Sequence, residues 1–167
     1  MRGKRSSISL RAALGIFSVT LLVTSTWATA QEKVLHNFGK GTDGSGPVAS
    51  LIFDSAGNLY GTAEYGGPYN YGMVFELTPK ADGWTEKVLH NFNNNGKDGG
   101  NPAGGLIFDS ASNLYGTTAG GGVYDSGTVF ELAPKLEGGW TEKVLHSFNN
   151  NGKDGTAPQA GHARDTH

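Results

Sequence analysis

Two aspartates at matching positions are the first candidates for chemistry. Asp54 lies in LIFDSAGNLYGT at 51–62 and Asp109 in LIFDSASNLYGT at 106–117. Paired carboxylates are the groups that glycosidases use as acid, base and nucleophile. Each aspartate, however, directly precedes a short turn, where an Asx side chain caps its own backbone. Equivalent positions in successive repeats point the same way, so we expect turn residues and no catalytic pair.

Three histidines recur once per repeat and could form a ring of metal ligands. His36, His90 and His146 each stand in the motif EKVLH(N/S)F. A metal site would need their imidazoles to converge with free nitrogens. The alternation of this motif instead places each histidine on one strand face with valine and phenylalanine. We therefore expect half-buried histidines held by a backbone partner, and no metal.

Other motifs give weak signals for ions or cofactors. The loop NNNGKDG at 93–99 and 149–155 resembles an oxygen-rich calcium loop, but Lys97 and Lys153 fall where ligands should be. Turns that need positive φ explain the asparagines and glycines equally well. The chain has neither a nucleophile elbow nor a phosphate-binding loop. We expect no cofactor and no catalytic residue.

Binding residues are expected where the repeats differ. The stretch AEYGGPYNYGM at 63–73 corresponds to TAGGGVYDSGT at 118–128. Tyrosine offers a rigid apolar face with a polar tip, which suits stacking on sugars or peptides. The alternative is that the tyrosines pack on the neighbouring repeat. The candidate ligand-binding residues are Tyr65, Tyr69, Tyr71, Tyr124 and Asp125.

These residues are positioned by a tandem repeat. EKVLH(N/S)F begins at Glu32, Glu86 and Glu142, so successive copies are 54 and 56 residues apart. In each copy a Gly-rich loop, LIFDSAxNLYGT, a variable stretch and VFELxPK follow in the same order. We divide the chain into repeat 1 (31–85), repeat 2 (86–141) and a partial repeat 3 (142–161).

Each repeat is predicted to form four short strands. EKVLHNF alternates like a half-buried strand, LIF and NLYGT flank a turn, and VFEL ends at a proline. No stretch after residue 30 sustains a helical apolar period. Four strands per 40 to 50 residues are typical of a β-propeller blade. The predicted fold is all-β and mostly antiparallel, with two complete four-stranded propeller blades and a truncated third.

The repeats resemble the GloVer tandem repeat, a β-propeller-like family of exported bacterial proteins that often end in one of several surface anchors. The matching segments are KVLHNF, LIFDSAGNLYGT and GMVFELTP in repeat 1, and KVLHNF, LIFDSASNLYGT and GTVFELAP in repeat 2. The resemblance covers residues 32–161. It implies a propeller-like fold and an extracellular setting, and it implies no established reaction.

Repeat 3 departs from the pattern where LIFD is due. Gly161 aligns with Gly105, but residues 162–167 read HARDTH. This aberrant tail favours a frameshift or a truncated reading frame. Two blades cannot close a propeller, which typically needs 4 to 8. We therefore expect marginal stability or self-association through exposed sheet edges, because unpaired edges template association.

The N-terminus predicts export. Residues 1–30 combine four basic residues, the apolar run AALGIFSVTLLV and Ala28-Thr29-Ala30, which together are typical of a signal peptide. Without this segment the formal charge is −6, which argues against nucleic acid. The sequence after residue 30 has no polybasic stretch, so we expect no membrane partner after cleavage. The chain has no cysteine for disulfides or thiol chemistry.

Two functions remain open at this point. The first is a non-catalytic module, secreted or at the cell surface, with a structural role or a glycan or protein partner. The second is a fragment of a secreted propeller-type carbohydrate-active enzyme. An enzyme should carry a charged cluster unique to one blade, whereas a scaffold repeats its polar residues. Because the Asp and His positions repeat, the sequence favours the module.

Overall fold

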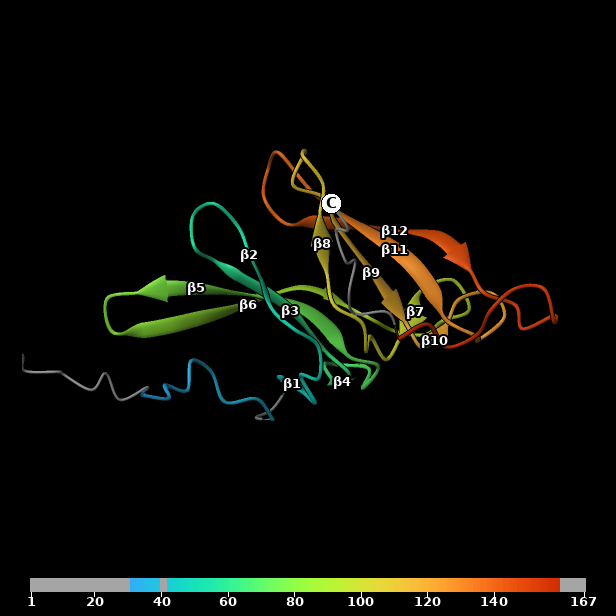
Figure 1. Cartoon of the computed structure of the whole chain (residues 1–167), viewed down its shortest axis with the longest axis horizontal. Coiled ribbons are helices and arrows are strands. Elements are labelled where there is room, and N and C mark those ends of the chain that lie inside the picture. The colour runs from blue at the N-terminus through green and yellow to red at the C-terminus, as the bar shows by residue number, and fades with distance from the viewer. Residues whose placement is uncertain (1–30, 40–41, 160–167) are drawn as a thin grey trace, which may run out of the picture. The chain divides into compact units, whose positions relative to one another are not determined.

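The computed structural model describes residues 31–39 and 42–159. The predicted signal peptide at 1–30 and the tail at 162–167 lie outside the described residues. In the described part the chain forms twelve strands and no helix, which confirms the all-β prediction (Figure 1). None of these residues belongs to a helix long and apolar enough to cross a membrane.

The strands build two four-stranded antiparallel sheets and two small ones. The first large sheet runs in the order β2 (Ile52–Phe53), β3 (Leu59–Ala63), β5 (Met73–Lys80) and β6 (Gly83–Asn91). The second runs in the order β8 (Ile107–Phe108), β9 (Leu114–Thr118), β11 (Thr128–Pro134) and β12 (Trp140–Ser147). The small sheets pair β1 (Gly44–Ser45) with β4 (Tyr65–Gly66), and β7 (Gly99–Gly100) with β10 (Gly120–Gly121). The large sheets match the predicted four-stranded blades.

The fourth strand of each large sheet comes from the following repeat. The EKVLH(N/S)F motifs of repeats 2 and 3 lie in β6 and β12, which pair with β5 and β11. The predicted strand over 32–38 is wrong, because residues 31–39 form no strand. A strand needs a partner for its ladder, and within the described residues β5 and β11 are already paired on both sides.

A bulge corrects the predicted alternation of this motif. Val88 pairs with Phe75 and His90 with Val74, so Leu89 is an extra residue between the two pairs. The same shift recurs in the second sheet. Because Phe75 and Val74 point to opposite faces, Val88 and His90 do too. Valine and histidine therefore lie on opposite faces of the sheet. The sequence pattern had predicted that they share one face, and this prediction is wrong.

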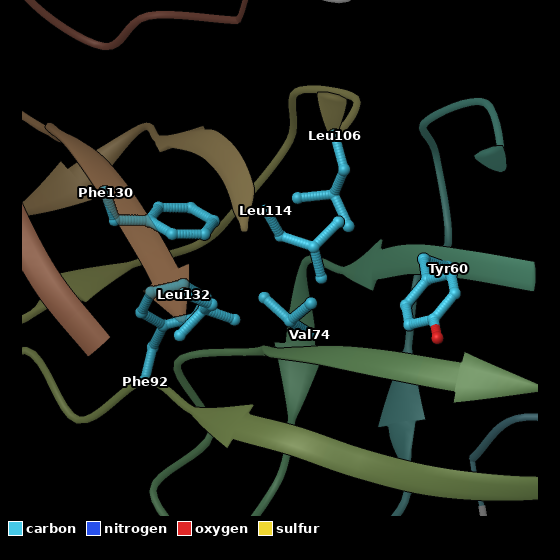
Figure 2. Close-up of a cluster of buried hydrophobic side chains, with 7 residues drawn as sticks. All are labelled: Tyr60, Val74, Phe92, Leu106, Leu114, Phe130 and Leu132. Atoms are coloured by element: carbon cyan, nitrogen blue, oxygen red, sulfur yellow. The ribbon is translucent and has the colours of Figure 1, made fainter. Parts of the chain in front are cut away.

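The main apolar cluster joins the two large sheets, which belong to one compact unit beginning at Lys33. Tyr60 and Val74 come from the first sheet, and four residues come from the second sheet and its preceding loop, with Phe92 between them (Figure 2). Those four are Leu106, Leu114, Phe130 and Leu132. A separate cluster on the opposite face of the first sheet contains Leu59, Ala63, Met73, Phe75 and Leu77.

Repeat 3 follows the path of repeat 2 through its described residues. The amide of Phe148 donates to the carbonyl of Gly127 at 2.9 Å, as the amide of Phe92 does to Gly72 at 3.0 Å. Ala157 N likewise donates to Ser126 O, as Asn101 N does to Tyr71 O, both at 2.8 Å. The backbone bonds that attach one repeat to the previous sheet are therefore reproduced up to this point.

Candidate functional site

The aspartates of LIFDSAxNLYGT are turn residues, as predicted. Asp109 Oδ1 accepts hydrogen bonds from the amides of Ala111 and Asn113 at 2.8 and 2.9 Å, and Oδ2 accepts from Asn113 and from the hydroxyl of Tyr115. Asp54 makes the equivalent four bonds. These bonds, the backbone bond from Asn113 above all, hold the pKa of Asp109 below its usual range. Each carboxylate is fully used within its own turn.

A cluster of His, Asp and Glu lies at each repeat boundary. In the first cluster, His36 Nε2 is 3.2 Å from Asp43 Oδ2 and 3.9 Å from Glu86 Oε2. In the second, His90 Nε2 is 3.3 Å from both carboxylate oxygens of Asp98, and Glu142 lines the same cavity. Histidine and aspartate belong to one repeat and glutamate to the next.

The aspartate of each cluster also fixes its loop. Asp98 accepts hydrogen bonds from the amides of Gly99 at 2.7 Å and Asn93 at 3.0 Å. The partner of each histidine is thus a carboxylate, which corrects the expected backbone partner. Asp43, Asp98, Glu86 and Glu142 were not predicted as site residues, and neither was Asp154, which lies 3.0 Å from His146 Nε2. The signal that could have found them is a carboxylate seven or eight residues after every EKVLH histidine, together with the glutamate that opens the next motif.

The glutamates carry an electrostatic cost. Burial, with the nearby charge of Asp98, raises the pKa of Glu142, and His90 opposes this only in part. Burial and Asp43 likewise raise the pKa of Glu86. The Oε1 atoms of both glutamates are buried and have no hydrogen-bond partner. Enzymes often use a carboxyl group with a raised pKa beside a second carboxylate as a general acid or base. Here the same arrangement occurs at both repeat boundaries and is not unique to one of them.

Metal binding finds partial support in the donor types. One donor atom each from His36, Asp43 and Glu86 lie within 4.8 Å of one another. Both oxygens of Asp43 already have partners, however, since Oδ1 accepts from the amide of Gly44 and Oδ2 faces His36. The NNNGKDG loop is a turn: Asn95 Oδ1 accepts from the amides of Lys97 and Asp98, and the φ angles of Asn94 and Gly96 are positive.

A polar cavity of about 410 Å³ opens beside the second cluster. Its wall combines the three cluster residues with two lysines and residues of the loop after β6. The lining residues are His90, Asn93, Asn95, Lys97, Asp98, Glu142, Lys143 and Val144.

We expect the substitution Glu142→Gln to stabilise the fold at neutral pH. A carboxyl group whose pKa is raised on folding contributes stability only in its protonated form, and this contribution is lost as pH rises through the folded pKa. Glutamine keeps the shape without the charge, so the melting temperature should rise by a few degrees at pH 7. The gain should vanish below the unfolded pKa of 4.5. Thermal melts at both pH values test this, and a lower melting temperature at pH 7 would contradict it.

The candidate tyrosines lie in the connections from β3 to β5 and from β9 to β11. Tyr69 and Tyr124 occupy equivalent positions and are 56% and 57% exposed. Tyr65 and Tyr71 are also exposed, but each ring lies over a glycine: a Cβ on Gly46 would be 3.4 Å from Tyr65, and one on Gly100 would be 3.3 Å from Tyr71. Tyr69 and Tyr124 are thus the more exposed pair, whereas the rings of Tyr65 and Tyr71 partly contact the chain.

Asp125 has a structural role in its loop. Its Oδ1 accepts hydrogen bonds from the amide of Gly121 at 3.0 Å and from Asn94 Nδ2 at 3.2 Å. Asn70, the equivalent residue of repeat 1, accepts from the amide of Gly66 in the same way. Both residues have positive φ, which asparagine and aspartate tolerate. Asp125 therefore shapes the loop that presents Tyr124.

Comparisons with known proteins agree with the repeat architecture. No curated protein and no solved structure matches the chain. The sequence model described as the Gloeobacter/Verrucomicrobia repeat matches residues 15–166, most of the chain. The two large sheets with equivalent strands, turns and clusters are what such a repeat should produce. The chain belongs to the Gloeobacter/Verrucomicrobia repeat family.

Proposed function

We propose that this repeat module is exported, acts without catalysis outside the cell or at its surface, and binds a glycan or an extracellular protein through its tyrosine loops. The observation that carries the proposal is the pair Tyr69 and Tyr124, two equivalent aromatic side chains that are more than half exposed. Export rests on the signal-peptide pattern of residues 1–30.

The loops hold these tyrosines in a fixed frame. In repeat 1 the amide of Gly72 donates to Gly66 O at 3.2 Å, and the amide of Asn70 donates to Gly67 O at 3.3 Å. In repeat 2 the amide of Gly127 makes the equivalent bond to Gly121 O, also at 3.2 Å. Small sheets anchor both loops at their bases. A rigid loop loses little conformational entropy on binding, which favours affinity.

The side chains suit a neutral or weakly polar ligand. A tyrosine ring can stack on the apolar face of a sugar while its hydroxyl donates or accepts a hydrogen bond. The formal charge of −6 after residue 30 disfavours polyanions such as nucleic acids, whose binding depends on clustered basic side chains.

The polar clusters support a scaffold over an enzyme. An active site should be unique to one blade, but His, Asp and Glu meet at both repeat boundaries. Asp54 and Asp109 use both carboxylate oxygens in their own turns.

The test compares three forms of the full-length chain on a printed oligosaccharide array, with pull-down of extracellular proteins as a second arm. In the Tyr69→Ala/Tyr124→Ala variant we expect binding to fall at least about tenfold, because aromatic anchors dominate such interfaces. Circular dichroism should be unchanged, since both side chains are exposed. Leu136→Ala is the matched control, because Leu136 is also exposed but lies outside the loops. Equal binding by all three forms would contradict the proposed tyrosine site.

A further inference from the structure

The boundary between repeats 1 and 2 brings three metal-ligating side chains together. His36 Nε2 lies 3.2 Å from Asp43 Oδ2 and 3.9 Å from Glu86 Oε2, and one donor atom from each residue lies within 4.8 Å of the others. In a tetrahedral zinc site, bonds of about 2.0–2.2 Å place neighbouring ligand atoms about 3.3–3.5 Å apart. The two measured separations are close to this value, so a small movement of the Glu86 side chain would complete the triangle.

The negative charge of this cluster is not balanced by the protein. Two carboxylates face one histidine, and their side chains are only 12% and 16% exposed. Glu86 Oε1 is buried without a hydrogen-bond partner, although its second oxygen faces His36. In the part of the chain that the structure describes, no lysine or arginine lies within 4.0 Å of Asp43 or Glu86. Buried charges are normally paired or bound to a metal, and a dication would neutralise both carboxylates.

Asp43 has a free acceptor position that its counterpart in the second cluster lacks. Asp98 Oδ2 accepts a hydrogen bond from the amide of Asn93 at 3.0 Å in addition to its contact with histidine. In the first cluster Gly39 stands at the position of Asn93, and the loop that leads to Asp43 is one residue shorter. Among the described residues, histidine is the one hydrogen-bond partner of Asp43 Oδ2, and no other group of three His, Asp or Glu donors comes as close together. These differences distinguish the first cluster from the second.

We propose that His36, Asp43 and Glu86 bind a divalent transition-metal ion, with Zn²⁺ as the closest match. Imidazole and carboxylate are common zinc ligands, and three protein ligands leave a position for water. Calcium, in contrast, takes about six to eight oxygen ligands. The ion would replace the proton between His36 Nε2 and Asp43 Oδ2, and the neutral ring would carry its proton on Nδ1. The hydrogen bond from Gly44 N to Asp43 Oδ1 at 2.8 Å would remain and orient the carboxylate.

The ion would attach the N-terminal segment to the first sheet. Residues 31–39 form no strand, whereas Glu86 belongs to β6, the fourth strand of that sheet. A ligand that binds only the folded state stabilises it by mass action. With zinc at about a hundredfold excess over the dissociation constant, the melting temperature should rise by at least about 5 °C. The site uses none of the candidate tyrosines, so its role is independent of the proposed ligand binding.

Calorimetric titration of the full-length, chelator-treated protein with ZnCl₂ measures this site. We expect saturable binding of one ion per chain, with a dissociation constant below about 100 μM. Glu86→Gln should raise the dissociation constant at least about tenfold, because it keeps the shape of the side chain but removes a charged ligand. Glu142→Gln is the matched control, since Glu142 is the equivalent residue at the second boundary, and it should bind zinc like the wild type.

The other two ligands are tested in the same way. Asp43→Asn and His36→Gln should each raise the dissociation constant at least about tenfold. Their controls are Asp154→Asn and His146→Gln, which change the equivalent residues of repeat 3 and should leave zinc binding unchanged. Circular dichroism of each variant confirms that it is folded.

Thermal melts give a second measurement. Zinc should raise the melting temperature of the wild type and of Glu142→Gln, and it should leave that of Glu86→Gln unchanged. A wild type without saturable binding at up to about 100 μM zinc would overturn the proposal, and so would equal binding by Glu86→Gln and Glu142→Gln. Binding that is lost in a His162→Ala/His167→Ala variant would also overturn it, because the ion would then belong to the C-terminal histidines.

Discussion

The substitution Phe92→Ala is expected to cost about 3–5 kcal/mol of folding free energy, the usual range for a buried phenylalanine. Phe92 is 1% exposed and lies between the two large sheets. Its ring contacts Phe130 at a centroid distance of 5.1 Å and His90 at 4.8 Å. Removing it leaves a cavity that neither sheet can close, because both are fixed by their ladders. Whole domains are stable by only about 5–15 kcal/mol, so the junction should open.

Phe148→Ala provides the matched control for this prediction. Phe148 is the equivalent residue of repeat 3 and makes the same edge-on contact with its histidine, at 4.7 Å, but it is only half-buried. Its loss should cost less than half as much. Urea denaturation followed by tryptophan fluorescence compares the two variants. Equal losses would show that Phe92 does not hold the sheets together.

The substitution Gly116→Ala is expected to destabilise the second sheet by about 1–3 kcal/mol through overpacking. Gly116 lies in β9 opposite Phe130, and a Cβ there would be 2.6 Å from Phe130 Cζ and 2.9 Å from Leu106 Cδ2. Phe130 and Leu106 are buried, so they cannot move aside cheaply. In open space alanine would instead gain about 0.5–1 kcal/mol over glycine in a strand. The clash outweighs this gain.

Gly155→Ala separates the clash from the general effect of the substitution. A Cβ at Gly155 would meet only Phe148, at 3.7 Å, which is an ordinary contact. This variant should lie within about 0.5 kcal/mol of the wild type, as surface substitutions usually do. Thermal melts of both variants provide the comparison. A Gly116→Ala protein as stable as the Gly155→Ala protein would mean that the sheet shifts to accommodate the methyl group.

The local structure could be predicted well from the sequence because each strand and turn motif occurs in two copies. The turns at Asp54 and Asp109, the strands that flank them and the all-β class follow from short-range chemistry, and the structure confirms them. The strand with which EKVLHNF pairs could not be predicted in this way. Which sheet a strand joins depends on contacts between repeats, and the motif reads the same whether it opens one sheet or closes the previous one. The bulge at Leu89 was hidden for the same reason, since it exists only against β5.

In the candidate site, too, the features within one repeat could be predicted and those that join two repeats could not. The exposure of Tyr69 and Tyr124 agrees with their place in the connections where the repeats differ. The His, Asp and Glu clusters could not be predicted, because Glu86 and Glu142 reach them from the next repeat. Spacing within one repeat connects each histidine to its aspartate, but only the fold adds the third residue. The structural role of Asp125 also depends on a partner in another loop, Asn94.

The offset between sequence repeat and sheet sets an order of events during synthesis. The ribosome makes the chain from the N-terminus, so β2, β3 and β5 emerge before the strand that completes their sheet. That strand, β6, ends at Asn91, inside repeat 2. The first sheet therefore stays incomplete, with one side of β5 unpaired, until the first residues of the next repeat have been synthesised. Every growing chain of this kind ends in an incomplete sheet until one more motif is translated.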